Sequence, residues 1–108
     1  MSERTIENAV IKKVDLLIED HDILTFFLTM EYAGGGQGFG GYKLDGEGAG
    51  NLCGKAIRSL LEVVGVYHWH DLVGRSVRVD HDWQKVYRLG HFLKDQWCDP
   101  ETWVEKKP

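Results

Sequence analysis

Residues 9–32, with the sequence AVIKKVDLLIEDHDILTFFLTMEY, predict the β-hairpin on which the fold depends. In its first strand, 9–19, apolar and polar residues alternate imperfectly, and the expected apolar face consists of Val10, Val14, Leu16 and Ile18. The second strand, 23–32, is rich in β-branched and aromatic residues and alternates an apolar face with a mixed one. The polar residues 20–22 between the two runs are typical of a turn.

Residues 51–64 predict a single amphipathic helix. Asn51 is the expected N-cap, and Gly65 lies where a left-handed C-terminal cap is favoured. One apolar stripe recurs at helical spacing and consists of Cys53, Ile57, Leu60, Leu61 and Val64. Because such a stripe needs a partner surface, we expect this helix to pack on a sheet.

A second hairpin is predicted after the helix. Residues 76–80 alternate as in a strand, and residues 85–94 form the expected antiparallel partner, with Gly90 as a bulge. A short strand is expected at 41–45. The fold class is therefore α+β: an antiparallel β-sheet from two hairpins plus a short strand, with one amphipathic helix packed on one face. We expect a single domain over residues 1–98 and a polar tail over 99–108, which frays unless Trp103 docks.

Composition limits the class of protein. The 108 residues suffice for one domain, and 13 basic against 17 acidic residues give a formal charge of −4. This charge argues against non-specific nucleic-acid binding and suits docking on a basic partner. Cys53 and Cys98 lie far apart, as expected for free thiols in a reducing compartment. No apolar run approaches the ~18–20 residues of a membrane span, and the first residues lack a signal-peptide core, so we expect a cytoplasmic protein without membrane attachment.

Nine of the 13 glycines fall within residues 33–50, which makes this segment the candidate binding loop. Such a segment can adopt positive φ and bring backbone N–H groups against an anion, helped by the helix N-terminus at 50–52. Phe39 and Tyr42 are expected to stack on a base. The alternative is structural, because glycines also serve flexible hairpin connections and close strand crossings. The segment matches neither the phosphate-loop nor the dinucleotide-binding pattern.

The candidate ligand- or partner-binding residues comprise this segment together with one aromatic and two basic residues that follow it. They are Gly34, Gly35, Gly36, Gln37, Gly38, Phe39, Gly40, Gly41, Tyr42, Trp69, Arg75 and Arg78.

No arrangement of residues indicates catalysis, and we expect no cofactor and no bound metal. His68 and His70 would point to opposite faces of an extended segment, which is poor geometry for chelating one ion. Neither cysteine lies in a nucleophile motif, and no serine does. Four tryptophans crowd the second half of the chain, which favours a protein-binding patch that includes Trp69.

Several short motifs spread over nearly the whole chain carry a resemblance to a known family. They are Glu31-Tyr32, residues 36–42 (GQGFGGY), Leu44-Asp45, Val64-Gly65-Val66, Trp69, Asp71-Leu72, Gly74, Val77-Arg78-Val79, Gly90-His91 and Trp97. In these motifs the sequence resembles a family of small bacteriophage and prophage proteins. The resemblance implies a phage setting and supplies no catalytic residues. Small acidic phage proteins of this kind often block bacterial defence, as CRISPR–Cas inhibitors do or as sponges for nucleotide signals.

Three hypotheses for function follow. The leading one is a non-catalytic phage accessory factor that inhibits a bacterial defence system, in the manner of a CRISPR–Cas inhibitor, by docking on a protein. The alternative is a sponge that sequesters a nucleotide immune signal through the glycine-rich loop, with Arg78 or Arg88 neutralising its charge. The third is a module that forms homo-oligomers through a sheet edge or its tryptophans.

Overall fold

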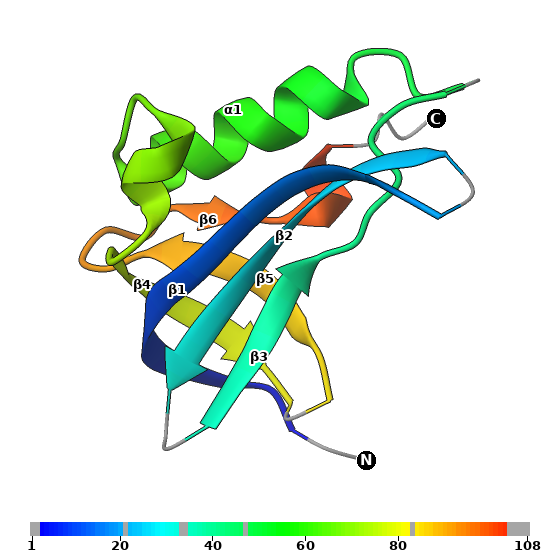
Figure 1. The fold of residues 1–108 in the computed structure, drawn as a ribbon. Helices are drawn as coiled ribbons and strands as arrows, with labels where there is room; N and C mark the ends of the chain where they lie inside the picture. Colours follow the sequence, from blue (N-terminus) through cyan, green and yellow to red (C-terminus); the bar gives the residue numbers. More distant parts are fainter. Residues whose placement is uncertain (1–2, 21, 33–34, 47, 83, 104–108) are drawn as a thin grey trace.

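A six-stranded antiparallel sheet and one α-helix make up the fold, which confirms the α+β class (Figure 1). The computed structural model describes residues 3–20, 22–32, 35–46, 48–82 and 84–103. Its elements are β1 (Thr5–Glu19), β2 (Ile23–Tyr32), β3 (Gly35–Gly40), α1 (Leu52–Val64), the 3₁₀ turn η1 (Trp69–Leu72), β4 (Ser76–His81), β5 (Val86–His91), β6 (Trp97–Cys98) and the 3₁₀ turn η2 (Pro100–Thr102).

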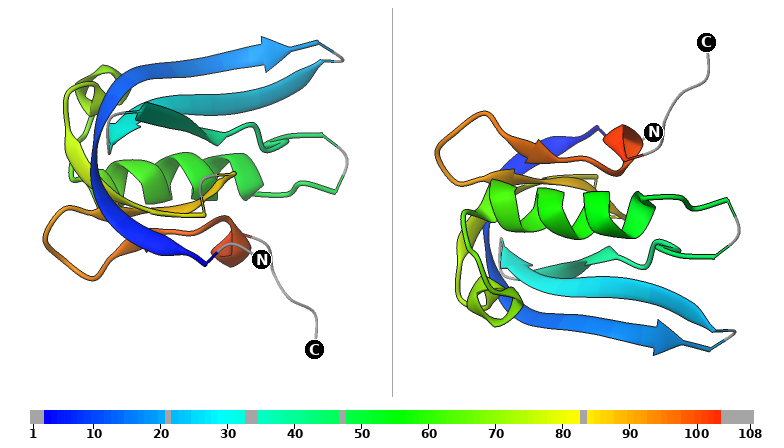
Figure 2. Two further views of the ribbon diagram at one scale, coloured as in Figure 1. Left: turned by 90° about the horizontal axis from the view of Figure 1, so that it is seen from below. Right: turned by 90° about the horizontal axis from the view of Figure 1, so that it is seen from above.

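The long strand β1 joins the two halves of the sheet, whose order is β3-β2-β1-β4-β5-β6. Residues 10–19 of β1 pair with β2, and residues 5–10 pair with β4. The order β3-β2-β1-β4 is that of a Greek key. Because β3 also contacts β5, the two ends of the curved sheet approach one another, which resembles the partly open barrels of OB folds. In Figure 1, α1 lies across the upper end of the curved sheet, and the views from below and above in Figure 2 show it over the space between the β1–β2–β3 strands and the β4–β5–β6 strands.

The helix packs against β5 and β6, as its apolar character predicts. Its buried residues are Ala56, Leu60 and Val63, of which only Leu60 belongs to the predicted stripe. The other members of the stripe, Cys53, Ile57, Leu61 and Val64, are partly buried against the core. Gly65 ends the helix at φ 88°, and its N–H donates to the Leu61 carbonyl at 2.9 Å, so the predicted left-handed cap is confirmed. Asn51 occupies the N-cap position, but its side chain makes no capping hydrogen bond, so its predicted capping role is wrong.

A β-bulge in β1 changes which of its residues face the core. Ile11 pairs with Met30 and Lys13 with Thr29, so one extra residue interrupts the ladder between them. Before the bulge Ile11 is buried, whereas after it Val14 packs against the core. The single face predicted for Val10, Val14, Leu16 and Ile18 is therefore wrong for Val10, because a one-residue insertion reverses the alternation.

Part of the predicted glycine-rich loop, Gly35–Gly40, is a strand. The short strand expected at 41–45 lies instead at 35–40 and pairs with β2 along its length. Glycine is needed there because the strands approach closely. At position 40, φ is +136° and a Cβ would lie 2.2 Å from the Phe26 carbonyl oxygen. The structural explanation of this segment, a close strand crossing, is therefore the one that the geometry supports.

The C-terminal end of the described chain belongs to the core. Trp103 is 4% exposed, and its ring lies 5.5 Å from Tyr42 and 6.0 Å from Phe26, measured between ring centroids. The short strand β6 and the turn η2 bring it there, and neither was predicted. A boundary at residue 98 is therefore wrong, since the docking of Trp103 extends the domain to residue 103; the remainder of the predicted tail lies outside the described residues.

Candidate functional site

The two aromatic residues of the predicted binding loop differ in their exposure. Phe39 is 1% exposed, and its ring packs against Phe26 at 6.0 Å. Tyr42 is half-buried between Phe39 and Trp103. Burial, with a smaller contribution from Asp99, raises the pKa of Tyr42. These rings hold the sheet against the C-terminal turn. Phe39 therefore has no surface for the predicted base stacking, whereas Tyr42 keeps part of its surface and lines a cavity of ≈ 340 Å³ with Arg4 and Lys85.

The other residues of that segment are spread along an edge strand. Gly35 and Gly36 are exposed, while Gln37 accepts a hydrogen bond from the Tyr32 hydroxyl. Gly38, Gly40 and Gly41 follow along the strand and its end, and Gly41 donates to the Phe26 carbonyl at 2.9 Å. Gly34 lies outside the described residues.

Trp69, Arg75 and Arg78 do not gather around β3. Trp69 is half-buried, with its ring edge-on to Phe26, and Arg75 donates to the carbonyl of Asp71. Arg78 lies on β4, which β1 and β2 separate from β3 in the sheet. Its guanidinium donates to the carbonyls of His91 (2.8 Å) and Lys94 (2.6 Å), so it fixes the turn after β5.

The buried carboxylate of Asp80, on β4, binds two further basic residues, Arg4 and Arg88. Asp80 accepts from Nε and Nη2 of Arg4 at 2.9 and 2.7 Å and from Nε of Arg88 at 2.7 Å. Burial alone would raise the pKa of Asp80, but the hydrogen bonds from both guanidinium groups outweigh it and the pKa is lowered. Arg88 also covers the ring of Trp97 at 4.0 Å. The guanidinium groups of Arg4 and Arg88 both make contacts within the fold, which fits a structural role for this network.

The turn end of the β1–β2 hairpin carries apolar side chains that the core does not cover. Leu16, Leu17, Ile18 and Phe27 are 48, 38, 67 and 40% exposed. Along β1 the core-facing row passes from buried Ile11 through Val14 to Leu16 and Ile18, so the hairpin extends beyond the core it helps to form. We call this end, residues 15–20 and 22–27, the hairpin arm; its turn lies at the right of Figure 1.

Carboxylates surround these apolar residues. Asp15, Glu19, Asp20 and Asp22 fall within residues 15–22, a stretch that contains no Lys or Arg. Asp45 lies beside the arm, where its carboxylate accepts from the Leu24 N–H at 3.4 Å. The nearest basic group on β1 is Lys13, 3.8 Å from Asp15. The arm is therefore apolar at its centre and acidic at its margin. The sequence contains a signal for this surface, since residues 15–20 (DLLIED) place three apolar residues between acidic ones. Alternation alone, however, places Leu16 and Ile18 on the face that is expected to be buried.

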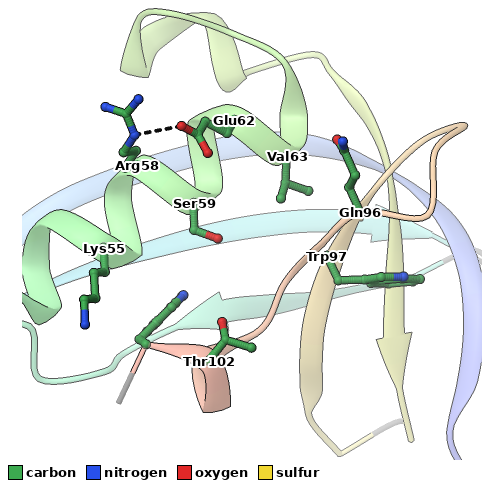
Figure 3. Close-up of a pocket in the computed structure, with 9 residues that line it drawn as sticks. Lys55, Arg58, Ser59, Glu62, Val63, Gln96, Trp97 and Thr102 are labelled. Carbon is green, nitrogen blue, oxygen red and sulfur yellow. Dashed lines mark ion pairs between the residues drawn. The ribbon is translucent and has the colours of Figure 1, made fainter. Parts of the chain in front are cut away.

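A cavity of ≈ 580 Å³ opens between α1 and the C-terminal segment (Figure 3). The helix contributes Lys55, Arg58, Ser59, Glu62 and Val63, and the facing segment contributes Gln96, Trp97, Thr102 and Trp103. The Arg58 guanidinium pairs with the Glu62 carboxylate at 2.7 Å. Apart from the tryptophans, none of these residues was noted in the sequence analysis. The helix and the facing segment are more than 30 residues apart in the chain, and no local pattern connects them.

Within the described part of the chain, no three His, Cys, Asp or Glu side chains converge as metal ligands would. No helix in that part is long and apolar enough to cross a membrane. Comparisons with protein-family models, curated proteins and solved structures found no match to this chain, so function has to be argued from its own surfaces.

Proposed function

We propose that the protein is a non-catalytic binding module that docks on a protein partner through the hairpin arm. The observation that carries this proposal is the run Leu16, Leu17 and Ile18, whose side chains are all at least 38% exposed. Leu16 and Ile18 lie on the face of the hairpin that continues the core, and Leu17 lies on the opposite face with Phe27. Soluble domains seldom leave consecutive apolar residues in water unless another surface covers them. Here the core is complete without them, so their retention at the end of a hairpin suits an interface.

The charge around the arm indicates the kind of partner. Four carboxylates between residues 15 and 22 complement a basic surface and would repel nucleic acid or an acidic protein. A clustered basic surface is typical of a protein that itself binds nucleic acid. Together with the resemblance to small phage proteins, this favours a nucleic-acid-binding protein of a bacterial defence system, inhibited by occupation of its basic surface in the host cytoplasm.

Direct binding of nucleic acid fits this surface less well. In OB-type barrels the face of the second and third strands binds oligonucleotides. In this chain that face carries Asp15, Thr29 and Glu31, with Phe27 folded over Gly38. Only Lys13 adds a positive charge there, and phosphate contacts need clustered cations. The fold therefore does not decide the function, and the arm's charge favours a protein partner.

The test uses two matched variants with exposed substitutions. Leu16→Ser/Ile18→Ser removes apolar surface from the arm, and Leu93→Ser removes an even more exposed leucine from the turn after β5. Proteins captured by the wild type from bacterial lysate are purified and titrated against all three forms. We expect the arm variant to weaken binding by about tenfold or more, Leu93→Ser to leave it unchanged, and added single-stranded nucleic acid to compete. Equal affinity of both variants, or no capture by the wild type, would contradict the proposal.

A further inference from the structure

The turn between β5 and β6 presents apolar side chains to solvent at the end of the molecule opposite the hairpin arm. In Figure 1 this turn lies at the left and the turn of the arm at the right, and both views of Figure 2 agree. Leu93 is 82% exposed, and Phe92 beside it is 41% exposed. Val73, which shortly precedes the neighbouring strand β4, is 49% exposed. We call residues 73–76 and 92–96 the turn surface.

Side-chain hydrogen bonds hold the β5–β6 turn in one conformation. The guanidinium of Arg78 donates to the carbonyls of His91 and Lys94, as described above. Nδ1 of His91 in turn accepts from the backbone N–H groups of Leu93 and Lys94, each at 2.9 Å. The turn therefore keeps Leu93 in water in a fixed position, and little conformational entropy is lost when another surface covers this side chain. A leucine presented in this way suits an anchor residue of an interface.

The margin of the turn surface is basic. Arg75 and Lys94 belong to it, and both are exposed. The exposed Lys12 lies next to it, because the carbonyl of Ile11 accepts from the N–H of Gly74 at 2.7 Å. Among the described residues, no carboxylate lies within ion-pair distance of any of these three cations. Their charges are therefore available to a partner.

Two carboxylates lie near these cations. Asp71 is 3.5 Å from the imidazole of the preceding histidine, and Asp95 accepts from the indole N–H of Trp97 at 2.9 Å. Glu31 is two strands away from β4, on β2. Arg78 is a fourth cation, since its guanidinium bonds to backbone carbonyls and to no carboxylate of the described residues. The turn surface is therefore positive on balance, on a chain whose formal charge is −4.

The hairpin arm has the complementary composition. Leu16 and Ile18 are its exposed apolar residues on one face, and Glu19, Asp20 and Asp22 lie at its turn without a cationic partner among the described residues. An apolar, acidic surface and an apolar, basic surface thus point in opposite directions. Two copies that meet through unlike ends bring opposite charges together, whereas two like ends would oppose equal charges.

We infer that the hairpin arm of one copy docks on the turn surface of a second copy, with Leu93 placed against Leu16 and Ile18. The inference shares the arm with the proposed function and adds its regulation, because a second copy competes with the partner for the arm. The contact differs from the sheet edge and the tryptophans that the sequence suggested for homo-oligomers. Since it joins unlike surfaces, it leaves one arm and one turn surface free and extends into chains.

The contact between copies is small, so we expect it to be weak, with a Kd of about 10–100 µM. At the lower protein concentrations of a partner titration it is negligible, which is why Leu93→Ser leaves partner binding unchanged. Sedimentation equilibrium of the purified protein between about 5 and 500 µM measures the assembly. We expect the average mass to rise with concentration beyond that of a dimer. About 0.5 M salt should weaken the association by about threefold or more.

Two variants test whether unlike surfaces meet. The arm variant Leu16→Ser/Ile18→Ser and the turn variant Phe92→Ser/Leu93→Ser change exposed residues only, and each should stay monomeric alone. Mixed in equal amounts they should form a 1:1 dimer and nothing larger, because one supplies an intact turn surface and the other an intact arm. Ile6→Ser, which removes an exposed isoleucine from the start of β1, should assemble as the wild type does.

The possible results separate this inference from the proposed function. A wild type that stays monomeric at every concentration, a turn variant that assembles normally, or a mixture that stays monomeric would overturn the inference. Capture of a partner through the arm by such a monomer would still support the proposed docking. Assembly of the purified protein without capture of any partner would support the inference and contradict the proposed docking.

Discussion

The ring of Phe27 on β2 lies over Gly38 on β3, so that a Cβ at position 38 would be 2.0 Å from the ring's Cζ. An aromatic ring that covers a glycine on an edge strand shields the backbone and fixes the register of the two strands. Gly90 and Trp97 repeat the arrangement at the other end of the sheet, where a Cβ would lie 2.7 Å from the indole. Glycine at these positions is therefore part of sheet packing.

Alanine substitutions along β3 should rank by what each new methyl group meets. Gly35→Ala meets nothing within 4 Å and should change the free energy of unfolding by less than about 0.5 kcal/mol. Gly38→Ala displaces a side chain that can turn away and should cost about 1–2 kcal/mol. Gly40→Ala meets the Phe26 carbonyl at 2.2 Å with φ +136° and should cost about 3 kcal/mol. Urea denaturation measures all three.

The coupling between positions 27 and 38 provides the control. In a Phe27→Ala background the methyl group at position 38 has room, so Gly38→Ala should cost about 1 kcal/mol less than it does in the wild type. An unchanged cost in that background would show that the ring is not what the glycine accommodates. Equal costs for Gly35→Ala and Gly40→Ala would contradict the close strand crossing.

Asp80 should make stability depend on acid. Its pKa in the folded protein is lowered below the ordinary aspartate value of 3.8, so the folded state favours the charged carboxylate. The resulting stabilisation is present above about pH 4 and is lost as the pH falls through the lowered value. Asp80→Asn removes it and leaves Arg4 and Arg88 without their anion, at a cost of about 1–3 kcal/mol at pH 7, since both guanidinium groups are partly exposed.

Denaturation curves of both proteins between pH 2 and pH 7 test this assignment. The difference in stability between wild type and Asp80→Asn should be constant at neutral pH and shrink toward pH 2. Asp71→Asn, a change at an exposed aspartate, serves as the control and should follow the wild type. A difference that grows on acidification would mean that the carboxylate is not stabilised by its guanidinium partners.

The spacing of apolar and polar side chains along the sequence predicts several of the elements correctly. The hairpin of β1 and β2, the helix with its Gly65 cap and the strand β4 lie close to their expected positions. What alternation could not show is the bulge between Ile11 and Lys13, because an inserted residue leaves no composition signal. The pairing of β1 with β4 joins residues about 70 positions apart, which no local window contains.

The candidate site was harder to predict for a related reason. Glycine carries no side-chain pattern, so residues 35–40 could not be distinguished from a loop, although they form a strand. Phe39 looked available and is buried, whereas Leu16 and Ile18 looked buried and are exposed. Whether an apolar residue at the end of a strand is covered depends on how far the core extends, and that is a property of the assembled fold.

Trp103 should be essential to the domain although it follows the predicted boundary. Trp103→Ala removes a buried ring that contacts Phe26 and Tyr42, and it should cost about 3–5 kcal/mol. Trp103→Phe keeps an aromatic ring and removes the unsatisfied N–H, so its cost should be below about 1.5 kcal/mol. Glu101→Ala, an exposed change in the same segment, is the control for thermal denaturation. A small effect of Trp103→Ala would place the domain boundary back at residue 98.

The two cysteines should differ sharply in reactivity. Cys98 is buried on β6, and burial raises the pKa of its thiol to about 12, with the Ser59 hydroxyl acting in the opposite direction. At pH 8 roughly one Cys98 in 10,000 is therefore a thiolate, the form that alkylating reagents attack. Cys53 is only partly buried, on α1. Native protein treated with iodoacetamide should acquire a single adduct at Cys53, located by peptide mass spectrometry, and a second adduct at Cys98 only after denaturation. Comparable labelling of both residues in the native protein would mean that the α1–β6 contact opens on the timescale of the reaction.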